Sequence, residues 1–172
     1  MSKTSLVLTI LGKDRPGLVD AIAHTVTEHG GNWIESRMAH LAGQFAGILR
    51  VEVDAERADS LQAALGSLAD GGLESTVLAD TTASESATIP SVQLSLVGQD
   101  RPGIVREISS VLARHEVNVE QLNTECLSAP HSGEMLFQAE AQLQLPQGLT
   151  ADKLRQALEE VTNDLMVDIT LE

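Results

Sequence analysis

The sequence predicts an α+β protein made of two similar small domains, each with the element order β-α-β-β-α-β. The tetrapeptide Asp-Arg-Pro-Gly occurs at residues 14–17 and again at 100–103, an offset of 86 residues in a chain of 172. Within each half, short apolar runs alternate with stretches whose apolar residues recur every three or four positions. Such runs and stretches are typical of strands and amphipathic helices, and the repeat indicates one domain present twice.

The first half opens with a strand and a helix. Residues 6–11 form an apolar run that ends at Gly12, which is typical of a buried strand followed by a turn. Pro16 suits the first position of a helix, where the missing N–H costs nothing. Gly30 and Gly31 predict the end of this helix. Its apolar stripe comprises Leu18, Ile22 and Val26.

A hairpin, a second helix and a last strand complete the first half. The β-like runs at 33–41 and 45–53 are joined by Ala42, Gly43 and Gln44, a hairpin signal. A helix is expected at about residues 58–68 and a strand at about 75–79, from the leucine spacing and the glycine pair between them.

The second half repeats this order, with strands at 92–97, 117–127, 135–145 and 166–171. Its helices are marked by apolar stripes that include Ile104 and Ile108 in the first and Leu154 and Leu158 in the second. The order predicts, in each half, a four-stranded antiparallel sheet with two helices on one face, the ferredoxin-like arrangement. We place the domains at residues 1–82 and 91–172, with the polar stretch 83–90 as a linker.

The charge argues against nucleic acid and membrane partners. The net charge is −14, from 12 acids and 6 bases in residues 1–86 (net −6) and 13 acids and 5 bases in residues 87–172 (net −8). Binding to nucleic acid or to an anionic membrane needs clustered lysine and arginine, which neither half provides. Units of about 80 residues are marginal alone, so the halves are expected to pack together or in a homodimer.

No catalytic, cofactor or metal motif is found in the sequence. The single cysteine, Cys126, excludes a disulfide within the chain, and no apolar run reaches about 18 residues. With no signal peptide either, we expect a cytoplasmic protein. The five histidines lack metal-ligand spacing, and no phosphate-binding loop, dinucleotide fingerprint or nucleophile constellation is present. The sequence therefore predicts a protein that is not an enzyme and has no cofactor.

The repeated motif resembles the ACT domain, a regulatory module that binds amino acids and similar small metabolites. The resemblance lies in a strand ending in Leu-Gly-x-Asp-Arg-Pro-Gly, an amphipathic helix, and an asparagine about 15 residues after the proline. Two such domains with nothing else resemble the glycine cleavage system transcriptional repressors. The segment Glu35, Ser36 and Arg37 is similar to one in that family, whereas the second copy has Gln121, Leu122 and Asn123, so the sequence favours the first copy as the tighter site.

The physics of the motif supports a binding loop. Gly12 and Gly98 are expected to take a positive φ where the strand turns. The following helix start has unpaired N–H groups that suit a carboxylate, and an asparagine at the start of the next strand could add an amide. The candidate ligand-binding residues are Gly12, Asp14, Arg15, Pro16, Gly17, Leu18 and Asn32, and in the second copy Gly98, Asp100, Arg101, Pro102, Gly103, Ile104 and Asn118.

A purely structural interpretation of the same residues stays open. Asp14 and Asp100 could serve as ordinary helix caps, and Arg15 and Arg101 could pair with nearby acidic side chains. The resemblance implies a regulator that binds an amino acid such as glycine and acts through a protein partner, a DNA-binding activator of glycine cleavage genes. The alternative is a free-standing amino-acid sensor or an accessory subunit of a metabolic enzyme, without a transcriptional role.

Overall fold

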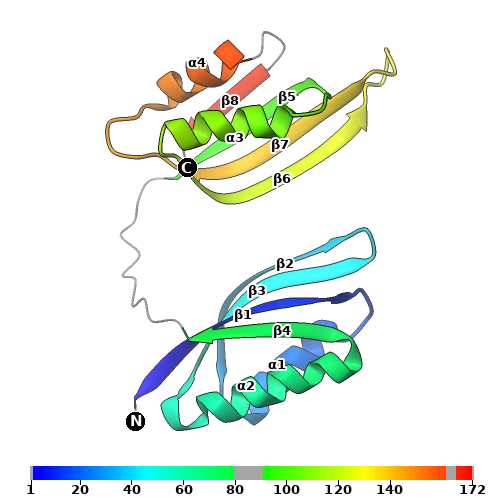
Figure 1. The fold of residues 1–172 in the computed structure, drawn as a ribbon, viewed down its shortest axis with the longest axis vertical. Coiled ribbons are helices and arrows are strands. Elements are labelled where there is room, and N and C mark those ends of the chain that lie inside the picture. Colours follow the sequence, from blue (N-terminus) through cyan, green and yellow to red (C-terminus); the bar gives the residue numbers. More distant parts are fainter. Residues whose placement is uncertain (1, 80–90, 162–165, 172) are drawn as a thin grey trace. The chain divides into compact units, whose positions relative to one another are not determined.

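The structure is a computed structural model that describes residues 2–79, 91–161 and 166–171 (Figure 1). The chain divides into two compact units, Met1–Ser84 and Glu85–Glu172. The predicted linker at 83–90 and the predicted domain end at residue 82 lie outside the described residues.

The first unit is a four-stranded antiparallel sheet with two helices. The strand order is β2-β3-β1-β4, so β1 lies in the middle and β2 at one edge. Short 3₁₀ turns at Ala55–Arg57 and Leu68–Gly71 flank the second helix. The elements are β1 (Lys3–Lys13), α1 (Leu18–Glu28), β2 (Asn32–Leu41), β3 (Gln44–Asp54), α2 (Ala58–Ser67) and β4 (Leu73–Ala79).

The second unit repeats this topology with the strand order β6-β7-β5-β8. Both units therefore have the predicted βαββαβ order, and the fold class is confirmed. The elements are β5 (Ser91–Gln99), α3 (Ile104–Arg114), β6 (Asn118–Ser128), β7 (Met135–Gln144), α4 (Ala151–Val161) and β8 (Met166–Leu171).

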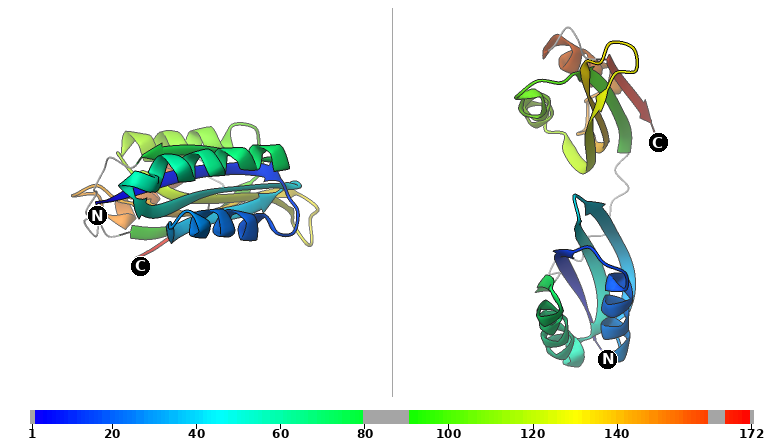
Figure 2. Two further views of the ribbon diagram at one scale, coloured as in Figure 1. Left: turned by 90° about the horizontal axis from the view of Figure 1, so that it is seen from below. Right: turned by 90° about the vertical axis from the view of Figure 1, so that its right-hand side faces the viewer.

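Both helices of a unit cover the same face of its sheet, here called the helix face, and leave the other face open (Figure 2). On β1, Leu6, Leu8 and Ile10 are buried, while the residues between them point to the open face. These side chains join Ile22 from α1 and Leu61 from α2 in one core. A separate aliphatic core fills the second unit. The alternation along the strands thus decides which face receives the helices.

The first helix of each unit begins two residues later than the sequence predicts. α1 begins at Leu18 and α3 at Ile104, so Pro16 and Pro102 lie in the preceding turn and not at the first helical position. Gly17, at φ 90°, is the N-cap of α1. The chain needs a left-handed residue to turn from β1 into α1, and this requirement shifts the helix start past the proline.

Candidate functional site

The motif loop of each unit ends in a glycine that both caps the helix and leaves space open. Gly17 and Gly103 have φ values of 90° and 92°, in the left-handed region that favours glycine. A Cβ atom built on either would meet no atom within 4 Å. Because the first N–H groups of a helix have no partner within it, this open space lies near such donors at the positive end of the helix dipole. In α3 the first of them, the N–H of Ile104, already donates to the carbonyl oxygen of Arg101 at 3.3 Å. The arrangement suits a small anion.

Neither aspartate of the motif caps its helix, so this part of the structural interpretation is wrong. The caps of α1 and α3 receive no side-chain hydrogen bond. Instead, the N–H of Asp14 donates to the carbonyl oxygen of Gly43 at 2.9 Å. The Asp14 carboxylate lies 3.6 Å from Nε2 of His40, on β2. These contacts attach the loop to the neighbouring β2–β3 hairpin.

Asp100 attaches the second loop in the same way. Its N–H donates to the carbonyl oxygen of Met135 at 2.9 Å. Its carboxylate lies beside Cys126, which occupies the position that His40 has in the first unit, opposite the phenylalanine that pairs with the motif strand. Desolvation by neighbouring atoms and the Asp100 carboxylate raise the pKa of the Cys126 thiol. The thiol is therefore held in its neutral form, and no nucleophilic role follows.

The two motif arginines, Arg15 and Arg101, bind different kinds of partner. Arg15 donates from Nη2 to the carbonyl oxygen of Gly71 at 2.8 Å, and not to an acid. Arg101 makes a bidentate pair with the Glu107 carboxylate, as the structural interpretation expects. The hydrogen bond from Arg101 keeps the pKa of Glu107 below its usual range. The first unit has Ala21 at the position of Glu107, so it cannot form this pair.

Gly12 and Gly98 serve the fold and not the turn, which corrects the expectation of a positive φ. Neither glycine is among those with a positive φ, and both are buried within a strand. A Cβ on Gly12 would lie 2.6 Å from the carbonyl oxygen of Gly72. The glycine is needed because the chain entering β4 approaches β1 closely at this point.

The structure does not bring the asparagines to the loops of their own units. Asn32 pairs with Glu52, and Glu52 pairs with Ser5 near the start of β1. Gly12 lies seven residues further along the same strand, which is about 23 Å at 3.3 Å per residue. Asn118 is level with Ser91, equally far from Gly98. Each asparagine comes soon after the motif helix in the sequence, but β2 and β6 begin at the end of the sheet that is opposite to the loops.

Sequence reasoning missed a hollow beside the second loop. It has a volume of about 590 Å³ and is lined by Gly103, Arg106, Glu107, Ser110, Arg114 and Val161. Two of these residues are arginines at the helical spacing of eight positions, which could have been recognised as one face of α3. In the first unit, Asp20 stands at the position of Arg106. The charges around the two loops therefore differ.

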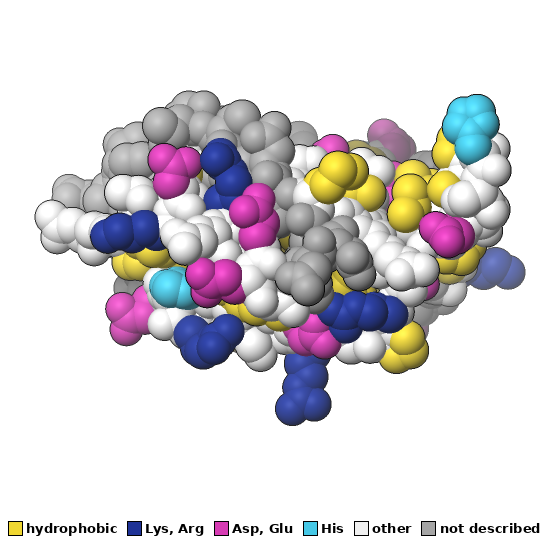
Figure 3. Space-filling model, turned by 90° about the horizontal axis from the view of Figure 1, so that it is seen from above, with side chains coloured by type: hydrophobic (Ala, Val, Ile, Leu, Met, Phe, Trp, Pro, Cys, Tyr) yellow, Lys and Arg dark blue, Asp and Glu magenta, His cyan; other side chains and the backbone are white. Residues whose placement is uncertain are grey.

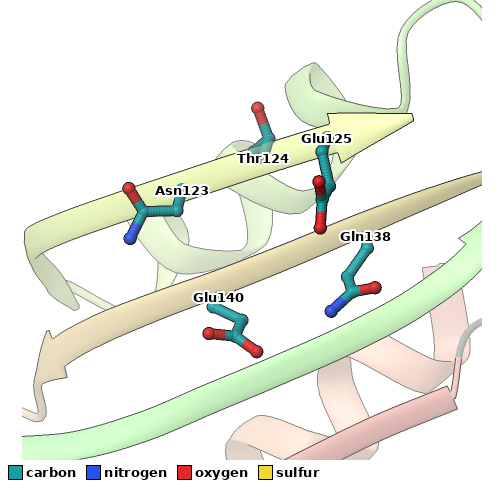
Figure 4. A pocket seen from close by; sticks show the side chains of 5 residues that line it. All are labelled: Asn123, Thr124, Glu125, Gln138 and Glu140. Atoms are coloured by element: carbon teal, nitrogen blue, oxygen red, sulfur yellow. The ribbon is translucent and has the colours of Figure 1, made fainter. Parts of the chain in front are cut away.

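A second hollow, of about 280 Å³, lies on the sheet of the second unit (Figure 4). Asn123 and Glu125 from β6 and Gln138 and Glu140 from β7 point to its open face. Thr124 projects from the other side of β6. The surface is amide-rich and acidic. Within the described ranges no three or more histidine, cysteine or acidic residues are grouped so that they could hold a metal ion.

Two further observations concern partners. Acidic and basic side chains are interspersed on the face shown in Figure 3, and the basic ones are not gathered into a patch there. Among the helices in the described part of the chain, none is long and apolar enough to cross a membrane.

The fold and the repeated loop define a tandem pair of similar α+β domains, and the comparison with protein families identifies their class. A model of the ACT domain matches residues 4–72 and again 91–172. The chain therefore belongs to the ACT domain family, with one domain in each unit.

Two relatives match this chain, one over nearly its whole length and one over about half of it. The glycine cleavage system transcriptional repressor of Escherichia coli (strain K12) is 25% identical over 166 residues, which cover 95% of this chain and 87% of the repressor. The UPF0237 protein MK1213 of Methanopyrus kandleri is 35% identical over 80 residues, which cover 46% of this chain and 82% of that protein. Together with the family, these similarities support a regulatory, ligand-binding role.

Solved structures match over the whole chain. A protein of Galdieria sulphuraria, itself described only as unknown, superposes with a TM-score of 0.87 at 29% identity and covers 99% of both chains. A candidate glycine cleavage system transcriptional repressor superposes with a TM-score of 0.74 at 16% identity, over 100% of this chain and 99% of that one. The second likeness concerns the fold alone.

Proposed function

We propose that this chain is a non-enzymatic regulator that binds a small amino acid, with glycine as the first candidate, and controls transcription of glycine cleavage genes through a protein partner. The similarity to the Escherichia coli repressor over 95% of this chain supports the transcriptional role. The net charge of −14 supports action through a protein, because DNA binding needs clustered cations.

The observation that carries the ligand-binding part is the open helix start after Gly17 and Gly103. A carboxylate placed there would accept hydrogen bonds from the first N–H groups of α1, or from those that follow Ile104 in α3, and gain from the helix dipole. These backbone donors recognise the part that all amino acids share. The open space beside each glycine leaves room for the remainder of a small ligand.

Asn32 and Asn118 can contact an amino acid bound at a loop only in one arrangement. A small amino acid cannot span about 23 Å, so it cannot touch the loop and the asparagine of one unit together. A ligand held by both groups would have to take them from two separate copies of the unit. Asn32→Ala should then weaken binding, whereas a site built on the loop alone should be unaffected by this substitution.

The two loops should differ in affinity, and the surrounding charges favour the second. Arg106 and Arg114 border the hollow next to Gly103, and both attract a carboxylate. Each helix also has an acidic residue in its first turn: Glu107 in α3 is paired with Arg101, whereas Asp20 in α1 stands where α3 has Arg106 and repels a carboxylate. The sequence favours the first copy because of the segment at 35–37. This segment lies away from the loop, because Glu35 pairs with Arg50 at 2.9 Å on the open face.

Isothermal titration calorimetry with glycine and the other amino acids tests the loop site. We expect saturable binding that Gly103→Val weakens strongly and that the double variant with Gly17→Val abolishes. Gly148→Val is the matched control, because Gly148 also has φ 90° and open space but lies outside the motif. Binding that survives the double variant would place the site elsewhere.

Capture of partners with and without the amino acid tests the transcriptional part. The full chain, immobilised, should retain a DNA-binding activator, and the ligand should change the amount retained. If no transcription factor is captured in either state while the amino acid still binds, the chain is a sensor without this transcriptional role.

A further inference from the structure

The outer face of α3, on the side of α4, carries two arginines. Arg106 and Arg114 lie eight positions apart, which is about 12 Å along one side of the helix at a rise of about 1.5 Å per residue. Both are exposed, and Ser110 lies midway between them. The Arg106 guanidinium makes no hydrogen bond or ion pair with any residue that the structure describes, and Arg114 donates from Nε to the carbonyl oxygen of Ser110 at 3.4 Å. Both guanidinium groups can therefore receive an external carboxylate.

These arginines border a groove on the outside of the helix layer. Next to the hollow of about 590 Å³ beside Gly103 lies another, of about 470 Å³. The two hollows share Arg114 and Val161, so they form one groove between α3 and α4, here called the α3–α4 groove. A groove between two packed helices suits a third helix, whose ridge of side chains can enter it.

The α3–α4 groove is positive, in contrast to the whole chain. Three arginines, at positions 101, 106 and 114, stand against Glu107 and Glu160, which gives a local charge of +1 in a protein of −14. Glu107 is already paired with Arg101, and Glu160 accepts a hydrogen bond from a glutamine of α4 at 3.2 Å. The groove therefore suits an acidic helix.

The first helix of the other unit carries the opposite charges at the same positions. The repeat offset of 86 residues places Asp20 where α3 has Arg106, and Glu28 where α3 has Arg114. Both acids are exposed. His24 lies midway between them, with Nε2 3.3 Å from a Glu28 oxygen, and the Glu28 side chain remains 60% exposed. The acidic face of α1 thus has the spacing of the basic face of α3, with the sign of the charge reversed.

These two helix faces fit each other when the helices run antiparallel. With the midpoints of the faces opposite each other, Asp20 meets Arg114 and Glu28 meets Arg106. Ser110, at the midpoint of the α3 face, is small and leaves room for the histidine opposite it. The antiparallel arrangement also brings opposite ends of the two helix dipoles together, which is favourable.

We propose that the α3–α4 groove of one copy of this chain holds α1 of a second copy. Because every copy has both faces, a two-fold axis repeats the contact and gives four ion pairs. Single exposed ion pairs contribute little, so the contact depends on the whole matched set and is specific because the charges alternate between the faces. It uses the helix faces alone and leaves the edges of both sheets uncovered. This inference does not rest on the proposed function.

Charge reversal tests the contact by sedimentation equilibrium of the full chain over a series of concentrations, without an amino acid. The salt is about 0.15 M, at which repulsion between charges more than about 8 Å apart is largely screened. An acidic variant carries Arg106→Glu and Arg114→Glu, and a basic variant carries Asp20→Arg and Glu28→Arg. Each variant alone places like charges opposite each other, so it should associate more weakly than the wild type, on the order of tenfold or more.

An equimolar mixture of the acidic and the basic variant is the decisive measurement. In a mixed pair, an acidic face again meets a basic face in both contacts, so the mixture should regain the association of the wild type. Such recovery also shows that both variants are folded. Lys3→Glu with Lys13→Glu is the matched control, because it changes the net charge as much as the acidic variant does, but both lysines are exposed on β1, outside the two helix faces. This control should associate as the wild type does.

Three results would overturn the proposal: a wild type that stays monomeric at every concentration, reversal variants that associate as the wild type does, or a mixture that associates no better than its components. None of these results bears on the ligand site, because no amino acid is present. A wild-type chain that binds glycine in calorimetry and stays monomeric removes the contact between α1 and the α3–α4 groove and leaves the ligand site standing.

Discussion

Two glycines of the first motif, Gly12 and Gly17, are needed for different physical reasons. Gly12 is required by a close approach, since a side chain would meet the carbonyl oxygen of Gly72. Gly17 is required by its backbone angle, since its surroundings are open. The sequence contains both in one motif and does not separate the two reasons.

Gly12→Ala should destabilise the first unit by about 1–3 kcal/mol, the usual cost of overpacking. The new methyl group would lie 2.6 Å from a backbone oxygen that cannot rotate away. Urea denaturation measures the effect. Gly66→Ala is the matched control, because Gly66 lies in α2 with open space around it. That control should stabilise by about 0.5–1 kcal/mol, and equal effects of the two substitutions would contradict the close approach.

The Arg101–Glu107 pair should make stability depend on pH in a defined direction. The pKa of Glu107 is lowered in the folded protein from its ordinary value of 4.5, mainly by the hydrogen bond from Arg101. The pKa of Glu107 is lower in the folded state than in the unfolded state. The pair therefore makes its full contribution to the free energy of unfolding above the unfolded-state pKa, and this contribution disappears as the pH falls through the folded-state pKa.

The test compares urea midpoints of the wild type and Glu107→Gln. The wild type should be the more stable at pH 7, and the difference should shrink as the pH is lowered below about 4.5, where the carboxylate takes up its proton. A difference that stays constant down to pH 3 would mean that the charge of Glu107 is not involved.

At the scale of elements, each strand is placed by turns as much as by its own pattern. The β2–β3 hairpin turns through Ala42 and Gly43, at φ 49° and 79°. Two successive positive φ values are typical of a type I′ turn, in which asparagine and glycine are preferred. Ala42 is thus the less favourable residue at the first position.

Ala42→Asn should stabilise the first unit by about 0.4–1 kcal/mol, because asparagine tolerates the left-handed region better than alanine does. Ala42→Val, with a branched side chain in the same place, should destabilise it. Thermal denaturation followed by circular dichroism measures both. If Ala42→Val proved more stable than Ala42→Asn, the turn would have another conformation.

At the scale of the whole molecule, charge sets the class of partner. The chain carries 11 lysines and arginines against 25 acidic residues, and both halves are negative. We expect no sequence-specific DNA complex at about 0.15 M salt with an affinity in the range of about 10⁻⁸ M or tighter that such complexes show. Fluorescence anisotropy with a labelled glycine cleavage promoter measures this, and a specific nanomolar complex would refute action through a partner alone.

Much of the fold could be predicted because the signals are local. The alternation of β7, the leucine spacing of α2 and the paired glycines each fix an element within a few residues. The start of α1 could not be placed, because it depends on the left-handed Gly17 and not on Pro16. The role of Gly12 could not be assigned, because its contact, Gly72, is 60 residues away in the sequence.

The sequence by itself determined the tandem βαββαβ order, the position of the repeated loop and the acidic character of both halves. These depend on side-chain periodicity, backbone preferences and charge, which are properties of neighbouring residues. Only the tertiary structure decided that Asn32 and Asn118 lie about 23 Å from the loops, because strand direction and register set distances across a sheet. It also decided that an apolar groove lies between β6 and α3, because its walls come from separate elements that meet only when the sheet and the helix pack together.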